Sequence, residues 1–386
     1  MNKFSLINNK MNYNNQLYID FEENLDLTYF PDSVFAINSL KELIQNKRLN
    51  ESFIEIKTPT IVEHKLWKET GHWNCFSENI LVFEGSNKNK KFTLKPMNCP
   101  GAALFVSNGK FDQNILKIFE IGNVFRNEKR GALSPFKRMI SFHQDDLHIF
   151  IKNLESSKFI IADLVEDWKE FFGKILNWKY KIVLSTKPQD SLGSDKDWEL
   201  SEKILSEVLL KKNLPIELDR EEGAFYGPKL DLMIDVNEKW VQLSTVQLDF
   251  FLTKNLKVEN YNFTIHSALF GSIERFFGVL LDKEGQIPSW LSNKEMVVLS
   301  IGCSNKYLNE VKDVLDLLKI KTIILENPNY NKVLKEFKYN YVFFLGWEEE
   351  QEEVVSIRNK NTQEKVRLDE ISSFFKNKLI LEFFKK

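Results

Sequence analysis

Strand-forming and helix-forming patterns are grouped along most of this chain, and this grouping limits the fold more than any other feature. Three strand-rich stretches follow one another over residues 79–146. Amphipathic helical patterns cover residues 156–177 and 198–212, and strand patterns return over 216–252. Neighbouring parallel strands need a crossover connection, whereas antiparallel strands need only turns. We therefore expect an α+β fold with one large antiparallel sheet flanked by helices.

Two further helices are expected at the ends of this region. Apolar residues recur at helical spacing over residues 32–50, and residues 51–63 then alternate as a strand that is broken at its proline. The stretch SALFGSIERFFGVLLDKEG predicts a helix that begins after a Gly-Ser pair and buries Ile273, Phe276 and Phe277.

The pattern changes after Trp290 to alternating strands and helices. A strand is predicted at 296–301, with helices near 305–318 and near Lys332 and further strands between and after them. This alternation favours a separate α/β domain over residues 292–386 with a mainly parallel sheet. At the other end of the chain, residues 1–24 are Asn-rich and indicate a loose tail or an added strand.

Net charge and cysteine content restrict the partners and the compartment. The chain has 53 Lys and Arg against 55 Asp and Glu, so any contact with nucleic acid must come from a local basic patch. Its 3 cysteines cannot build a disulfide framework, which favours a reducing compartment. The sequence has neither an apolar signal core nor a long unbroken apolar run, so neither export nor membrane spanning is indicated. We expect a cytoplasmic protein.

Histidine is scarce, with 5 in the whole chain, and two of them form a candidate metal site with one cysteine. Cys99 lies in KPMNCPG, His148 in QDDLHIF, and His266 at the end of the strand pattern FTIHSA. Each alone is more often a core or turn residue, and their spacing is not that of a zinc finger. If they converge in space, one thiolate and two imidazoles would leave a bound zinc ion an open coordination position. The residues alone leave both interpretations open.

Arginines next to strand patterns form a candidate phosphate site. Arg126 and Glu128 follow the strand pattern IFEIGNV, Arg138 lies a few residues further on, and Arg275 opens the predicted helix after the Gly-Ser pair. Arginines on adjacent strands can bind phosphate through paired N–H groups, and a helix N-terminus also favours anions. A solvated sheet edge with ion pairs is the competing interpretation. The sequence contains neither a Walker nor a Rossmann glycine loop.

Several strings together, in order along the chain, resemble the catalytic domain of threonyl-tRNA synthetases. They are KTPTIVEHKLWKETGHW, LKPMNCPG, GNVFRNEKRGALSPFKRMISFHQDDLHIF, YGPKLDL, VQLDF and HSALFGSIERFFGVL. The resemblance runs from about Leu25 to the C-terminus and implies a class II synthetase fold, with a catalytic domain over 25–291 and an anticodon-binding domain over 292–386. It also implies that KELIQ to KTPT is motif 1, which builds a homodimer interface, that FRNE is motif 2, and that the GSIERF helix is motif 3.

The resemblance implies ATP-dependent ligation of L-threonine to tRNA(Thr) through a threonyl-adenylate, with Mg²⁺ accompanying ATP. One zinc ion per chain would be held by Cys99, His148 and His266 and would chelate the amino and hydroxyl groups of threonine. The residues expected around threonine are Asp146 at its hydroxyl, Tyr226 at its amino group and Gln144 at its carboxylate. Valine lacks the second chelating atom, and a site built around a hydroxyl strongly rejects the analogue without it.

The resemblance also assigns residues to ATP and to the tRNA end. Arg126 would contact the threonine carboxylate and the α-phosphate, Glu128 the adenine, and Arg138 the triphosphate. Phe142 and Arg275 would sandwich the adenine ring, which is a stacking and cation–π arrangement. The remaining implied site residues are Lys229 and Gln247, which would line the same site, and His72, which would activate the terminal ribose hydroxyl of the tRNA.

Departures from the family pattern bear on fidelity and on tRNA binding. Ala102 stands where the family usually has His, and Ser267 where it usually has Arg, so those side-chain roles are lost or supplied elsewhere. No two histidines have the H-x-x-x-H spacing of the editing domain, and barely 25 residues precede the catalytic domain. We therefore expect a short form without in-chain editing. The segment LENPNYNKVLKEF replaces a basic stretch, so anticodon recognition is expected to be reduced.

A synthetase-like paralogue that binds tRNA or regulates without chemistry is the alternative to an active ligase. Arg126, Arg275 and all three zinc-type ligands are retained. A paralogue freed from catalysis has no reason to keep phosphate-binding and metal-binding residues together, so their retention favours the ligase.

Overall fold

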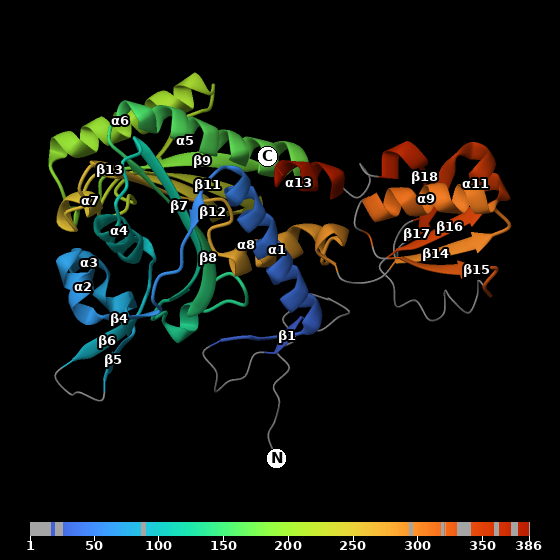
Figure 1. Ribbon diagram of the computed structural model, residues 1–386, viewed down its shortest axis with the longest axis horizontal. Coiled ribbons are helices and arrows are strands. Elements are labelled where there is room, and N and C mark those ends of the chain that lie inside the picture. The colour runs from blue at the N-terminus through green and yellow to red at the C-terminus, as the bar shows by residue number, and fades with distance from the viewer. Residues whose placement is uncertain are drawn as a thin grey trace, which may run out of the picture. The chain divides into compact units, whose positions relative to one another are not determined.

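A large sheet dominates the structure, a computed structural model that describes residues 17–19, 26–85, 90–292, 296–317, 320, 322–329, 341–358, 363–371 and 377–385. The described strands of this sheet are, in spatial order, β10 (Glu217–Asp219), β9 (Tyr180–Ser185), β11 (Lys229–Val236), β12 (Lys239–Asp249), β13 (Phe263–Ala268), β8 (Ser141–Ile151), β7 (Ile115–Phe125) and β3 (Ile54–Glu55). All neighbours pair antiparallel except the two outermost pairs, β10 with β9 and β3 with β7. The predicted antiparallel sheet with flanking helices is confirmed (Figure 1).

The register of the central strands decides which polar side chains meet. β7 and β8 are 11 residues long each and pair along their full length, so residues 144–148 of β8 lie opposite residues 118–122 of β7. On its other edge β8 pairs with β13, where His148 lies directly opposite His266. Because side chains on one face recur at every second residue, this register fixes the polar face of the sheet centre.

Two long helices cover one face of the sheet, as the sequence predicts. α5 (Glu155–Trp168) continues into a π-helical segment over Lys169–Ile175, and α6 (Asp195–Lys211) packs beside α5 and against β9 and β11 (Figure 1). A capping box formed by Ser194 and Asp197 starts α6, which satisfies backbone N–H groups that the helix leaves free.

The helix expected after the Gly-Ser pair is α8 (Ile273–Glu284), and its N-terminus is fixed by a side-chain cap. The Ser272 hydroxyl accepts a hydrogen bond from the backbone N–H of Arg275 at 3.1 Å. Ile273, Phe276 and Phe277 are fully buried, as predicted, and Phe276 stacks on Phe270 with ring centroids 4.3 Å apart. The long helix predicted over residues 32–50 is also present, as α1 (Pro31–Asn50).

The first two strand-rich stretches do not join the large sheet, contrary to the prediction. β5 (Val82–Glu84) and β6 (Lys91–Leu94) pair with β4 (Ile61–Glu63) in a separate three-stranded sheet among the described residues. β6 is the middle strand of this sheet and pairs with β4 on one edge and with β5 on the other, while Ile61, Val82 and Phe83 remain exposed. Four shorter helices complete this part: α2 (His64–Glu69), α3 (His72–Phe76), α4 (Cys99–Asn108) and α7 (Leu252–Asn255).

Contacts between Cα atoms divide the chain into two compact units, residues 1–29 with 40–285 and residues 30–39 with 286–386. Most of the expected tail over residues 1–24 lies outside the described residues. Within it, β1 (Tyr18–Ile19) pairs antiparallel with β2 (Thr28–Tyr29), so this short part is an added strand.

The second unit contains a mixed sheet and not the mainly parallel sheet that was expected. Its described strands are, in spatial order, β15 (Thr322–Glu326), β14 (Met296–Ile301), β16 (Val342–Gly346), β17 (Val354–Arg358) and β18 (Gln363–Arg367). β14 is parallel to both of its neighbours, whereas β16–β17 and β17–β18 are antiparallel. The link between β16 and β17 holds only α11 (Trp347–Glu352) and Glu353, which is too short for a parallel crossover.

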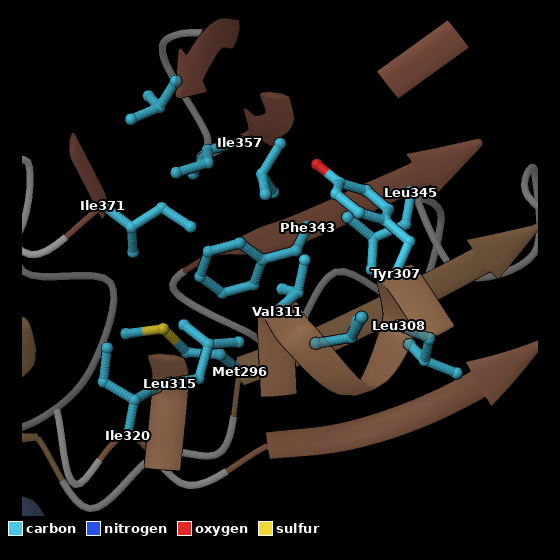
Figure 2. Packing of buried hydrophobic residues seen from close by; sticks show 13 residues of the cluster. Met296, Tyr307, Leu308, Val311, Leu315, Ile320, Phe343, Leu345, Ile357 and Ile371 are labelled. Carbon is cyan, nitrogen blue, oxygen red and sulfur yellow. The ribbon is translucent and has the colours of Figure 1, made fainter. Parts of the chain in front are cut away.

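The core of the second unit forms between this sheet and α9 (Asn305–Leu317). Tyr307, Leu308, Val311 and Leu315 of α9 point toward the sheet residue Phe343 and its neighbours in a buried cluster (Figure 2). α13 (Asn377–Phe383) is the last described helix. The helix predicted near Lys332 lies outside the described residues. In the part of the chain that the structure describes, no helix is long and apolar enough to cross a membrane.

Candidate functional site

The three candidate metal ligands converge at the centre of the large sheet. Cys99 begins α4, and His148 and His266 face each other on β8 and β13, with ring centroids 4.9 Å apart. One ligand atom from each residue lies within 4.8 Å of the others, and all three side chains are buried. The strand pairing therefore brings together residues that are far apart in the sequence.

The chemistry of this trio, Cys99, His148 and His266, fits a metal ion. His148 Nε2 is buried and has no hydrogen-bond partner among the described residues. His266 Nε2 is bonded to Asp249 at 2.9 Å, which leaves Nδ1 as its ligand atom. Burial raises the pKa of the Cys99 thiol well above its usual range, but a coordinated cation removes a thiol proton. One sulfur and two imidazole nitrogens can therefore hold a metal ion.

His72 lies beside this trio and not on an open surface. Its Nδ1 is 2.8 Å from the Thr70 hydroxyl, which donates its own proton to the Leu66 carbonyl at 2.9 Å. The hydroxyl oxygen therefore accepts from His72 Nδ1–H, and His72 Nε2 is left as an acceptor 3.5 Å from Cys99 Sγ. Burial lowers the pKa of His72 to about 4, so the ring is neutral at neutral pH. Its expected role toward a ribose hydroxyl stays a prediction.

A cavity of about 470 Å³ is lined by two members of the trio, Cys99 and His266. Seven residues that the sequence assigns to the site contribute to its wall: Cys99, Arg126, Gln144, Asp146, Tyr226, Gln247 and His266. The Tyr226 hydroxyl donates to Gln247 Oε1 at 2.5 Å, and Gln144 Oε1 is buried with no hydrogen-bond partner among the described residues. A buried acceptor without a partner is rare in folded proteins, and Gln144 is also one of the residues that form the cavity wall.

Asp146 provides a buried carboxylate next to the metal-ligand trio. Its Oδ2 accepts from Asn98 Nδ2 at 3.0 Å, and its Oδ1 lies 3.8 Å from His148 Nε2. Burial raises the pKa of Asp146 to about 6, although the Asn98 hydrogen bond and the nearby His266 act in the opposite direction. A cation bound by the trio would favour the ionised carboxylate further.

The amide of Asn98 occupies the space that a side chain at Gly122 would need. A Cβ added at Gly122 would lie 2.3 Å from Asn98 Oδ1, which is closer than any real contact of this kind. The absence of a side chain at Gly122 therefore lets Asn98 hold Asp146 in place.

Gly122→Ala is expected to lower the free energy of unfolding by about 1–3 kcal/mol, because Asn98 must move and the packed strands must shift. Urea unfolding monitored by tryptophan fluorescence measures this change. Gly131→Ala is the matched control, since an added Cβ there meets nothing within 4 Å. Equal stability of the two variants would show that Asn98 moves without cost.

Three arginines, Arg126, Arg138 and Arg275, lie close to one another and to the carboxylate of Glu128, and Arg126 is part of the cavity wall. The guanidinium of Arg126 lies 5.1 Å from the Phe142 ring centroid, and its Nε is 3.4 Å from the Pro96 carbonyl. Arg138 pairs with Glu128 at 2.8 Å, and Arg275 Nε donates to the Lys137 carbonyl at 2.8 Å. Burial lowers the pKa of Arg275, and the nearby Arg126 and Arg138 lower it further. Guanidinium groups stay charged in proteins, so this region is positive.

This geometry supports parts of both sequence interpretations of the arginines. Arg138 and Glu128 form the ion pair expected of a solvated edge. Arg126 and Arg275 form no ion pair within the described residues, and both are directed to backbone carbonyls. Phe142 lies beside Arg126, and the expected sandwich of an adenine ring between Phe142 and Arg275 stays a prediction.

Lys229, whose expected role in the site stays a prediction, lies on β11. It does not contribute to the cavity wall, and its ammonium group is paired with Asp231. Asp231 also accepts from Ser185 at 2.9 Å and from Thr245 at 3.0 Å, which anchors the pair in the sheet.

Sequence reasoning missed Asn98, Asp249 and a buried pair next to Asp146. Lys95 Nζ lies 2.7 Å from Glu120 Oε1, and both side chains are almost fully buried. Glu120 lies directly opposite Asp146 in the β7–β8 register. A charged residue on the inward face of a strand pattern was the available signal for Glu120. Asn98 and Asp249 stand inside the strings NCPG and VQLDF, but nothing in the strings shows which groups they bond.

The two departures from the family pattern are both buried. Ala102 lies inside α4, and Ser267 lies on β13 at the cavity wall, where its hydroxyl donates to the Thr245 carbonyl at 3.1 Å. Neither contacts the metal-ligand trio through a described hydrogen bond.

Comparisons with known proteins agree with this architecture. Residues 82–284 match the tRNA synthetase class II core domain (G, H, P, S and T). The chain is 33% identical to threonine–tRNA ligase 2 of Bacillus subtilis over 91% of its own length and 57% of that protein, and 32% identical to the cytoplasmic threonine–tRNA ligase of Saccharomyces cerevisiae over 87% and 48%. It therefore spans about half the length of these curated relatives.

Solved structures that cover 95% of this chain give the same result. The RNA binding domain of threonyl-tRNA synthetase from Cryptosporidium parvum Iowa II is 30% identical, with a TM-score of 0.76 over 95% of this chain and 96% of that one. A putative threonyl-tRNA synthetase from Aeropyrum pernix shares the fold, with a TM-score of 0.75 at 22% identity. The family match covers more than half of this chain, and the first of these structures aligns over nearly its full length, so the chain belongs to the threonyl-tRNA synthetases of the class II tRNA synthetase family.

Proposed function

We propose that this chain is a threonine–tRNA ligase that joins L-threonine to tRNA(Thr) through a threonyl-adenylate. The observation that carries the proposal is one cavity whose wall combines the Cys99 and His266 ligands, the Asp146 carboxylate and the Arg126 guanidinium. These groups suit the amino, hydroxyl and carboxylate groups of threonine and the α-phosphate of ATP. ATP is proposed to enter with Mg²⁺.

On the threonine side, we propose that the metal is one zinc ion held by Cys99, His148 and His266. When bound, zinc would act as a Lewis acid that takes the amino and hydroxyl groups of threonine as ligands. Asp146 is proposed to accept a hydrogen bond from the hydroxyl. This is supported by the Asn98 hydrogen bond to Oδ2, which orients the carboxylate, and by Oδ1, which lies 3.8 Å from His148 Nε2 and forms no hydrogen bond within the described residues. Tyr226, Gln144 and Gln247 complete the pocket wall.

On the ATP side, the arginine cluster is proposed to bind and polarise the phosphates. A threonine carboxylate oxygen attacks the α-phosphorus, the bond to the β-phosphate bridging oxygen breaks, and pyrophosphate leaves. Arg126 is proposed to neutralise the charge that develops on the α-phosphate. Arg138 would contact the leaving phosphates after release from Glu128, which would then be free for the adenine. Phe142 and Arg275 are proposed to flank the adenine ring.

Transfer to tRNA completes the reaction. A terminal ribose hydroxyl attacks the carbonyl of the adenylate, and AMP leaves. His72 is proposed to activate this ribose hydroxyl for the attack. Lys229 would reach the site only if its ion pair with Asp231 were broken. The catalytic domain is proposed to span residues 25–291, and the α/β unit over 292–386 is proposed to bind the anticodon.

A homodimer through motif 1 is proposed as the working form. β3 is an edge strand of the large sheet, where Ile54 is 41% exposed, and Leu49 near the end of α1 is 48% exposed. An uncovered sheet edge with apolar side chains is a surface that proteins usually protect.

Threonine-dependent ATP–pyrophosphate exchange tests the proposed function. Valine is expected to react with a kcat/KM about 10⁴-fold below threonine or lower, because it leaves the groups at the hydroxyl unpaired. Serine keeps both chelating atoms and loses one methyl contact, so its kcat/KM is expected to fall only about 10- to 200-fold. A chain that binds tRNA but shows no exchange with threonine would be the non-catalytic paralogue instead.

The same chain is proposed to form Ser-tRNA(Thr) without removing serine from it, since its 5 histidines include no H-x-x-x-H pair. Incubation of preformed Ser-tRNA(Thr) with and without the chain follows this directly. Enzyme-dependent hydrolysis would require an editing activity among the residues of this chain.

A further inference from the structure

Asp249 lies at the end of β12 and is bonded on both of its carboxylate oxygens. Oδ2 is 2.9 Å from His266 Nε2, and Oδ1 accepts from the backbone N–H groups of Phe251 at 2.6 Å and Leu252 at 3.0 Å. The side chain is 2% exposed. The two backbone N–H groups fix the direction of the carboxylate, so its second oxygen can only meet His266.

This contact determines which nitrogen of His266 carries the proton. A carboxylate can only accept, so the proton between the two groups belongs to Nε2, and the lone pair of His266 is on Nδ1. Nδ1 is the nitrogen left for the trio with Cys99 and His148, whose ligand atoms lie within 4.8 Å of one another. In metal sites the second nitrogen of a ligating histidine usually donates to a carboxylate or carbonyl in this way.

We propose that Asp249 is a positioning residue for the metal site: it holds His266 in the Nε2–H tautomer and presents Nδ1 to the ion. This inference rests on the proposed metal-binding role of the trio. The competing interpretation is a purely structural contact, in which Asp249 stabilises the fold and has no influence on how the trio binds a metal ion.

Asp249→Asn separates these two interpretations, because asparagine has only one oxygen. If that oxygen keeps the bonds to Phe251 and Leu252, the amide NH₂ group faces His266 Nε2 and forces the proton onto Nδ1. If the amide turns around, the two backbone N–H groups lose their acceptor and the side chain is no longer fixed. In both cases zinc affinity is expected to fall about 10- to 100-fold, the usual cost of losing such a partner.

Asp145→Asn is the matched control. Asp145 is also a buried carboxylate that accepts from two backbone N–H groups, those of Leu269 at 2.7 Å and Phe270 at 3.1 Å. It lies on the opposite face of β8 from Asp146, because successive side chains alternate. The same chemical change at the same degree of burial is therefore made without touching an imidazole of the trio.

The first experiment measures the His266 tautomer in the full-length chain after zinc is removed with a chelator. Long-range ¹H–¹⁵N spectra of ¹⁵N-histidine-labelled protein distinguish Nδ1–H, Nε2–H and doubly protonated rings, and His266→Gln identifies the signal. We expect Nε2–H in the wild type and a change of protonation site in Asp249→Asn. A wild-type ring that carries its proton on Nδ1 and not on Nε2 overturns the inference, even if the variant fails to fold.

The second experiment measures zinc affinity by competition with a chromophoric chelator. We expect Asp249→Asn to bind zinc about 10- to 100-fold more weakly than the wild type. We expect Asp145→Asn to stay within about threefold of the wild type. Equal losses in both variants, or no loss in Asp249→Asn, overturn the inference. A wild type that binds no zinc contradicts the proposed metal site instead, so the two failures are distinguishable.

Discussion

Arg126→Ala is expected to reduce kcat for threonine-dependent ATP–pyrophosphate exchange by about 10²- to 10³-fold, the usual cost of removing one preorganised donor at a developing charge. Arg126 lies at the end of β7, with its guanidinium fixed between the ring of Phe142 and the Pro96 carbonyl. It therefore needs little reorganisation when charge appears on the α-phosphate. Exchange assays at saturating ATP and threonine separate this effect on kcat from weaker binding.

The control for this change is Arg367→Ala on β18. Arg367 is exposed and pairs with Asp369 in the second unit. Exchange needs no tRNA, so this variant should keep the wild-type rate. Near-normal exchange in Arg126→Ala would remove this arginine from the reaction, and a raised KM for ATP with unchanged kcat would reduce its role to binding.

Cys99→Ala is expected to lower zinc affinity by more than about 100-fold, because losing a direct ligand exceeds the effect of an outer partner. The rate of threonine activation should fall as well. Without the metal ion, the threonine hydroxyl loses the proposed ligand bond that valine cannot form. Metal analysis after gel filtration gives the zinc content, and exchange assays give the activity.

The melting temperature tests the Cys99→Ala prediction without an activity assay. A metal that binds only the folded chain raises its apparent stability, so the melting temperature of the wild type should rise with zinc concentration. That rise should disappear in Cys99→Ala. Cys303→Ala is the control, because Cys303 is a free thiol that lies beside Ser300 in the second unit. A Cys99→Ala variant that keeps one zinc per chain would show that the trio is not the metal site.

Those parts of the fold that depend on local pattern were predictable from the sequence. The buried face of α8 follows from the spacing of Ile273, Phe276 and Phe277, and its start follows from Ser272. Strand pairing was harder to predict from the sequence, because it depends on contacts between residues that are distant in the sequence. The short strands β5 and β6 carry a normal strand pattern, and only their pairing in the structure shows that they form a separate sheet with β4.

Within the site, residue types were predictable and their partners were not. Cys99, His148 and His266 stand out because these residue types are rare in the chain. Asn98 and Asp249 are ordinary polar residues. They matter because Asn98 donates a hydrogen bond to Asp146, and Asp249 is bonded to His266. The ion pair between Lys229 and Asp231 shows the same limit, since a lysine in a sequence string carries no information on whether its charge is already neutralised.

The pairing of β8 with β13 has a consequence for the order of events during synthesis. His148 meets His266 only when these two strands are in register, and a slip of one residue would turn one ring to the opposite face of the sheet. The ribosome adds about 5–20 residues per second, so roughly 6–24 seconds separate the synthesis of the two histidines. Throughout that interval the nascent chain has only Cys99 and His148 of the trio. An ion that binds when His266 emerges would close a loop of more than a hundred residues. It would stabilise only those nascent chains in which β8 and β13 are already paired in the correct register.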